Sequence, residues 1–99
     1  MSNKNKEITN EVFIRCKKNV KFRREDFGCV IYDRNTNSFY SCNPSGAFII
    51  ENLREGSYLQ QIIKMLCEKF PDESPDKIEK DVKSFLSQLL YMGLIYYEK

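Results

Sequence analysis

The cysteines are the first residues to consider for chemistry, because the chain contains no histidine. They are Cys16, Cys29, Cys42 and Cys67, and no two of them form the CxxC pair that is typical of a structural zinc site. Without histidine, the chain has no imidazole base to activate a thiol. The equal spacing of the first three cysteines is unusual, and we favour small apolar packing over redox or metal chemistry for them. We therefore expect no resident metal and no cofactor.

Other signs of catalysis are weak. Glu25 and Asp26 are adjacent, and neighbouring side chains in a strand or turn point apart, which makes a poor acid/base pair. The 4 glycines are too widely spaced for a phosphate-binding loop. Cys42 precedes a predicted helix, whose N-terminus would lower its pKa, but no histidine is available to pair with it. We predict no catalytic residue and no enzymatic activity.

The composition is that of one small globular domain. The 99 residues are 41% hydrophobic and 30% charged, and no apolar run approaches the ~20 residues that span a bilayer. The first ten residues are polar and lack the apolar core of a signal peptide. We predict a cytoplasmic protein without membrane association, with a flexible segment at 1–10 and a single domain at 11–99.

Positive charge gathers near the N-terminus. Residues 1–26 hold eight basic and four acidic side chains, a net of +4 within a total of +2. Two interpretations remain open: a solvated basic face, or a surface that attracts an acidic partner.

The first half of the chain has the pattern of β-strands. Residues 12–14 form a short apolar run, residues 19–24 alternate with the period of a half-buried strand, and residues 29–32 and 39–42 are rich in β-formers. Turn-forming residues fill positions 33–37. The last three of these runs predict a three-stranded antiparallel meander.

The second half has the pattern of three helices. Asn43-Pro44 and Ser74-Pro75 each combine an N-cap with a proline at the first helical position. Ser57 and Gln60 suggest a capping box for the middle helix. The apolar tail 94–97 is expected to pack back onto the core. Strands precede helices without alternating, so we predict an α+β fold.

The strand predicted at Ser38–Cys42 is the last of the meander and contains neither charge nor proline. Exposed sheet edges are normally protected by such residues. Three explanations remain open: a liability to aggregate, a site that accepts another strand, or coverage by residues 11–16 of the same chain.

Residues 27–94 resemble the PqqD-like family, also called RiPP recognition elements. The resemblance lies in the hairpin at 28–42, the segment Asn43-Pro44-Ser45-Gly46-Ala47, the helix at 59–70, and the pattern from Asp81 to Ile95. No single motif is diagnostic, whereas their order and spacing together are specific. The resemblance implies a winged helix-turn-helix domain that binds the leader part of a ribosomally synthesised precursor peptide.

In that family the leader adds as a strand to the third strand and lies between this strand and the third helix, here at 76–92. The implied partners are a precursor leader peptide and a peptide-modifying enzyme, separate or fused, such as a radical-SAM maturase. The domain would then act as a peptide chaperone in natural product biosynthesis and post-translational modification. The implied peptide-binding residues are Ser38, Phe39, Tyr40, Ser41, Cys42, Asp81, Lys83, Ser84, Phe85 and Gln88. Asp81, Ser84 and Gln88 lie on one flank of the helix and Lys83 on the other.

Two alternatives compete with peptide binding. One is a nucleic-acid-binding winged helix regulator, which is disfavoured because residues 74–93 carry three lysines against three acids and no arginine. The other is a homodimer formed by pairing Ser38–Cys42 with its own copy.

Overall fold

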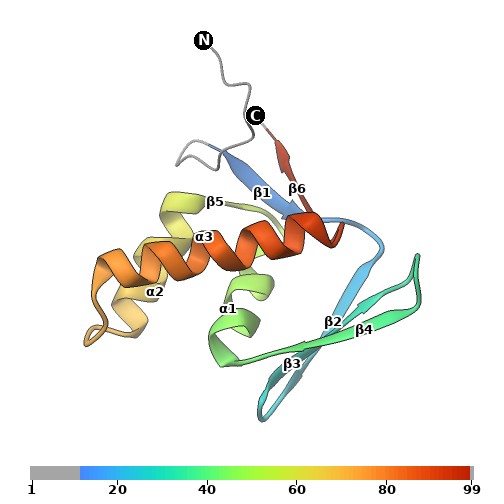
Figure 1. Ribbon diagram of the computed structural model, residues 1–99, viewed down its shortest axis with the longest axis horizontal. Coiled ribbons are helices and arrows are strands. Elements are labelled where there is room, and N and C mark those ends of the chain that lie inside the picture. The colour runs from blue at the N-terminus through green and yellow to red at the C-terminus, as the bar shows by residue number, and fades with distance from the viewer. Residues whose placement is uncertain (1–11, 99) are drawn as a thin grey trace.

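A computed structural model of the protein describes residues 12–98 (Figure 1). The elements of this part of the chain are β1 (Phe13–Cys16), β2 (Val20–Glu25), β3 (Gly28–Asp33), β4 (Ser38–Cys42), α1 (Pro44–Leu53), β5 (Ser57–Tyr58), α2 (Leu59–Lys69), α3 (Pro75–Tyr91) and β6 (Ile95–Glu98). The α+β prediction is confirmed. The flexible segment predicted at 1–10 and both ends of the predicted domain, residues 11 and 99, lie outside the described residues.

The predicted meander is the antiparallel sheet β2-β3-β4. Its register pairs Tyr32 with Phe39 and Ile31 with Tyr40. The turn between β3 and β4 contains Asn37 with φ of 59°, a left-handed conformation that asparagine tolerates better than most residues. The hairpin projects from the helical part of the molecule and leads directly into α1 (Figure 1).

A second antiparallel sheet, in the order β5-β1-β6, was not predicted. The tail that was expected to pack on the core forms β6, and Arg15 and Cys16 of β1 pair with Tyr96 and Ile95. Strand β5 has only two residues and completes the sheet on the other side of β1. This sheet assembles the beginning, middle and end of the described chain, and such distant pairings leave little local signal.

Local capping defines the helix starts. The Asn43 side chain accepts a hydrogen bond of 2.8 Å from the Gly46 N–H, and Ser74 accepts one of 3.4 Å from the Lys77 N–H, so both predicted caps are confirmed. The capping box predicted for Ser57 and Gln60 is wrong by one residue. Ser57 is paired in β5, α2 begins at Leu59, and the Gln61 side chain accepts from the Tyr58 N–H at 3.4 Å.

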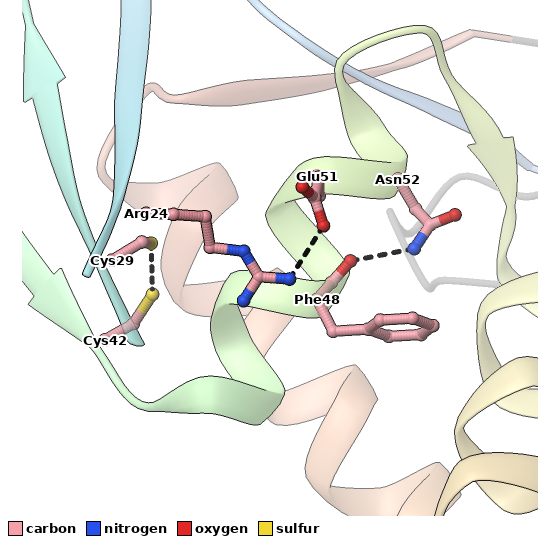
Figure 2. Close-up of polar contacts among 6 residues, drawn as sticks. All are labelled: Arg24, Cys29, Cys42, Phe48, Glu51 and Asn52. Carbon is pink, nitrogen blue, oxygen red and sulfur yellow. Dashed lines mark hydrogen bonds and ion pairs between the residues drawn. The ribbon is translucent and has the colours of Figure 1, made fainter. Parts of the chain in front are cut away.

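The three helices and both sheets share one apolar core. Helix α3 contributes Ile78, Val82, Leu86 and Leu89, and α1 contributes Ala47, Ile49, Ile50 and Leu53. An ion pair between Arg24 and Glu51 joins β2 to α1 at 2.9 Å (Figure 2). None of the helices between residues 12 and 98 has both the length and the apolar character needed to cross a membrane.

Candidate functional site

Strand β4 has an open edge. It pairs with β3 on one side, and no strand among residues 12–98 pairs with it on the other. The suggestion that residues 11–16 cover this edge is wrong for the described part of that segment, because β1 pairs with β5 and β6 instead. Phe13 and Ile14 find their partners in the β5-β1-β6 sheet, so the described part of this segment leaves the β4 backbone uncovered.

The sheet register identifies which backbone groups face the open edge. The Arg34 N–H donates to the Asn19 carbonyl at 2.9 Å, so Arg34 directs its polar groups toward the β2 side of β3. Directions alternate along an antiparallel strand, so Asp33, Ile31 and Cys29 direct theirs toward β4. Their partners on β4 are Ser38, Tyr40 and Cys42. It follows that Phe39 and Ser41 present their N–H and C=O groups outward.

The two edges of this sheet differ in charge. At the other edge, β2 carries Lys21, Arg23, Arg24 and Glu25 in a strand of six residues. Strand β4 carries no charged residue and no proline. Charged side chains discourage strand addition, so only the β4 edge has the character of a strand-accepting site.

A groove of about 460 Å³ lies beside the end of β4. The residues that line it are Asn43, Ser45, Gly46, Ile49, Leu66, Phe70, Glu73, Lys77, Ile78, Asp81, Val82, Ser84, Phe85 and Gln88. They come from the beginning of α1, the end of α2 with the loop that follows it, and one face of α3. The lining combines apolar and polar side chains, which suits a peptide that inserts some of its side chains.

Only one flank of α3 lines the groove. Asp81, Ser84, Phe85 and Gln88, four of the five helix residues predicted from the sequence, line it. Lys83 does not, and its ammonium group instead lies 3.0 Å from the Glu79 carboxylate.

The side chains of β4 divide between two faces. Tyr40 and Cys42 pack against the core, while Phe39 is 69% exposed on the opposite face together with Ser41. Ser38 shares the face of Tyr40 by strand alternation. All five predicted strand residues thus belong to the open-edged strand, and they present two separate faces.

Gly46 brings β4, α1 and α3 together. A Cβ atom at this position would lie 3.0 Å from the Cys42 Cβ and 3.2 Å from the Phe85 ring. The absence of a side chain therefore lets α1 begin in close contact with both, and the groove begins where the strand ends.

Two of the three charged side chains on the groove wall form an ion pair. The Lys77 ammonium donates to the Asp81 carboxylate at 2.8 Å, and this hydrogen bond, with the negative charges of Asp81 and Glu73, raises the pKa of Lys77. The pair is exposed and contributes little to stability. The pair neutralises Lys77 and Asp81, and Glu73 leaves the groove lining with a net charge of −1.

Sequence reasoning missed the groove residues on α1 and α2. Asn43, Ser45 and Gly46 were recognised only as a helix start, although that start directly follows the strand proposed to bind peptide. Leu66 and Phe70 lie in a region that carried no signal beyond helical periodicity, because their approach to α3 depends on how α2 packs.

Two of the four cysteines lie side by side on neighbouring strands. The Cys29 and Cys42 sulfur atoms lie 2.9 Å apart across β3 and β4 (Figure 2). Burial and the neighbouring Cys29 raise the pKa of Cys42 to about 12, which overturns the lowered value suggested by its position before a helix. Burial likewise raises the pKa of Cys16 to about 11. Within residues 12–98, no cluster of three or more potential ligands is placed to hold a metal ion.

Comparison with known proteins identifies the family. The sequence profile described as coenzyme PQQ synthesis protein D (PqqD) matches residues 28–95, which run from the start of β3 into β6. The chain belongs to the PqqD family. The predicted resemblance is confirmed, and this membership covers the open edge, α1 and the whole of α3. No curated protein matches the chain at a significant level.

Two similar solved structures share the fold of this PqqD family member. One is TbiB1 in complex with the TbiA(beta) leader peptide, with a TM-score of 0.75 and 21% identity over 82% of this chain and 93% of that chain. The other is a lasso peptide synthetase B1 complexed with the leader peptide, with a TM-score of 0.73 and 18% identity over 84% of this chain and 96% of that chain.

Proposed function

We propose that this protein binds the leader of a ribosomally synthesised precursor peptide by β-strand addition to β4. The observation that carries the proposal is an open, uncharged strand edge next to a groove with apolar side chains in its lining. Membership of the PqqD family supports it, as do two similar structures that contain leader peptides. The proposed product class is a modified peptide or a peptide-derived cofactor.

Binding would use two sets of contacts. The outward N–H and C=O groups of Phe39 and Ser41 would pair with the leader backbone, largely without regard to its sequence. Leader side chains directed toward α3 would enter the groove near Phe85 and give specificity. A short leader must become ordered when it binds, so an affinity of about micromolar is expected.

The domain would contribute proximity and no chemistry of its own. By holding the leader, it would raise the effective concentration of the rest of the precursor at a modifying enzyme, either separate or fused. A radical-SAM maturase is one candidate for that enzyme. The four free cysteines fit a reducing compartment, and we place this function in the cytoplasm.

Nucleic-acid binding receives no support from α3. Lys77 and Lys83 are engaged by Asp81 and Glu79, so two of the three lysines on this helix are neutralised locally. A helix that binds the phosphate backbone would need an excess of unpaired basic side chains.

The decisive experiment removes one outward N–H. Ser41→Pro deletes the donor that faces the open edge and leaves the inward ladder to β3 intact. The probes are leaders of short precursors encoded beside this gene, and we expect Ser41→Pro to lower the affinity for them by about tenfold or more. The variant loses a neutral hydrogen bond to the peptide, and the proline ring also blocks the edge. Fluorescence anisotropy with labelled synthetic leaders measures this directly.

Two controls define the result. Ser41→Ala keeps the N–H and should retain binding. Circular dichroism should show that Ser41→Pro remains folded. Unchanged affinity in a folded Ser41→Pro protein would contradict strand addition at β4.

A further inference from the structure

The face of the β2-β3-β4 sheet directed away from the helices carries an aromatic row. Lys21, Tyr32 and Phe39 are in register across the three strands. The Tyr32 and Phe39 rings stack with centroids 4.7 Å apart and an angle of 28° between their planes. The Tyr32 hydroxyl donates to the Asn37 side chain at 2.6 Å, which holds the Tyr32 ring in place.

Phe39 ends this row at the open edge. One side of its ring contacts Tyr32, and the side chain is still 69% exposed. It does not belong to the core, and it lies on the face opposite Tyr40 and the groove. The exposed apolar surface of Phe39 lies at the edge where an added strand would cover it, and removing that surface from water would favour binding.

A strand added to β4 would place one residue directly beside Phe39. The backbone groups of Phe39 face outward, so in an antiparallel added strand the peptide residue opposite Phe39 would exchange both hydrogen bonds with it. In such a pair the two side chains lie on the same face of the sheet, with Cα atoms about 5.5 Å apart. The peptide residues on either side would face the groove instead.

We infer that Phe39 selects an aromatic or β-branched side chain in the bound peptide, on the face opposite the groove. This inference rests on the proposed function and adds a second specificity determinant to it. The peptide would extend the stacked row from two residues to three, and cross-strand pairs of these types are favourable. A leader would thus be recognised on both faces, by the groove and by the Phe39 row.

The test begins with a displayed library of random peptides selected on the wild-type protein. We expect the enriched peptides to share an aromatic or β-branched residue at one position, flanked on both sides by residues selected by the groove. Selection on Phe39→Ala should lose that preference and keep the flanking ones. If the wild-type protein enriches no peptide, the proposed function fails and this inference falls with it.

A double-mutant cycle then measures the contact itself. For an enriched peptide, Phe39→Ala and alanine at the selected peptide position should each weaken binding by about twofold to tenfold, as expected for one aromatic pair. Because both changes remove the same contact, their combined effect should be clearly smaller than the product of the two.

Tyr58→Ala is the matched control. Tyr58 is also an exposed aromatic, 45% accessible, and its ring contacts Phe13 in the other sheet, with centroids 5.0 Å apart. Tyr58→Ala and the peptide change should act independently, so the factors by which they raise the dissociation constant should multiply. The inference is wrong, while the proposed function stands, if the wild-type protein binds peptides but shows no preference beside Phe39. It is also wrong if the effects of Phe39→Ala and the peptide change on the dissociation constant simply multiply.

Discussion

Asp33 lies buried at the end of β3 and organises the turn that leads to β4. Its carboxylate accepts hydrogen bonds from the Asn19 amide at 2.6 Å and from the Asn35 N–H at 3.0 Å. Its carbonyl accepts from the Asn37 N–H at 2.8 Å. These contacts fix the register in which Phe39 and Ser41 face outward, so a buried carboxylate far from the groove determines which groups a peptide would meet.

Asp33 should make the stability of the protein sensitive to acid. The Asn19 hydrogen bond, followed by the Asn35 N–H, holds the pKa of Asp33 below its ordinary value. Its stabilising contribution is therefore present above about pH 3.9 and lost as the pH falls through the lower folded value. We expect Asp33→Asn to lower the melting temperature at neutral pH and to lose less stability than wild type below pH 4.

Thermal unfolding followed by circular dichroism across that pH range provides the measurement. Asp26→Asn, which changes an exposed carboxylate in the β2–β3 turn, is the control and should follow the wild-type curve. Parallel curves for wild type and Asp33→Asn would show that the carboxylate charge does not stabilise the turn.

The sequence identified the residues of β4 but not the direction of their backbone groups. From the sequence alone, a proline at any position of β4 is expected to remove a donor from the edge strand, Tyr40 included. The register shows that the Tyr40 N–H faces β3, so this change would break the hairpin itself. Strand alternation predicts that the backbone groups of neighbouring residues point to opposite sides. The hydrogen bond between Arg34 and Asn19 shows that those of Phe39 and Ser41 point outward.

At the scale of elements, the junction of β4 and α1 is the part of the site that local sequence specifies best. Asn43 ends the strand, caps the helix and lines the groove. This was predictable because a cap followed by proline acts within one turn of helix. Helix α2 and strand β5 were predicted less well. Ser57 has the chemistry of a cap, but its pairing with Ile14, distant in sequence, takes precedence.

Removing the α1 cap should destabilise the protein measurably. Asn43→Ala leaves the Gly46 N–H without its side-chain acceptor, and we expect a loss of about 1 kcal/mol in the free energy of unfolding. Asn43→Asp keeps an acceptor and should stay close to wild type. Urea denaturation measures the change as a shift of the midpoint with a constant slope. An Asn43→Ala midpoint equal to that of wild type would contradict the assigned capping function.

At the scale of the whole molecule, one sheet closes the fold and the other carries the open edge. The β5-β1-β6 sheet closes the fold by joining segments from both ends of the described chain, and Ile14 and Ile95 are buried in it. The β2-β3-β4 sheet extends away from the helices and leaves one edge of β4 unpaired among the described residues (Figure 1). The sequence predicted the β2-β3-β4 sheet because its strands are consecutive. It could not predict the β5-β1-β6 sheet, whose pairings depend on the completed arrangement of the helices.

The open edge also bears on the oligomeric state, because β4 could pair with β4 of a second copy. Strand β4 has five residues, and only Phe39 and Ser41 direct their backbone groups outward. Self-pairing through so short an edge would bury far less than the ~1,000 Å² expected of a stable interface. We therefore expect sedimentation equilibrium to give a monomer at micromolar concentration, with Ser41→Pro indistinguishable from wild type. A wild-type dimer that Ser41→Pro abolishes would instead show that the β4 edge is occupied by a second copy, and a leader would then have to displace it.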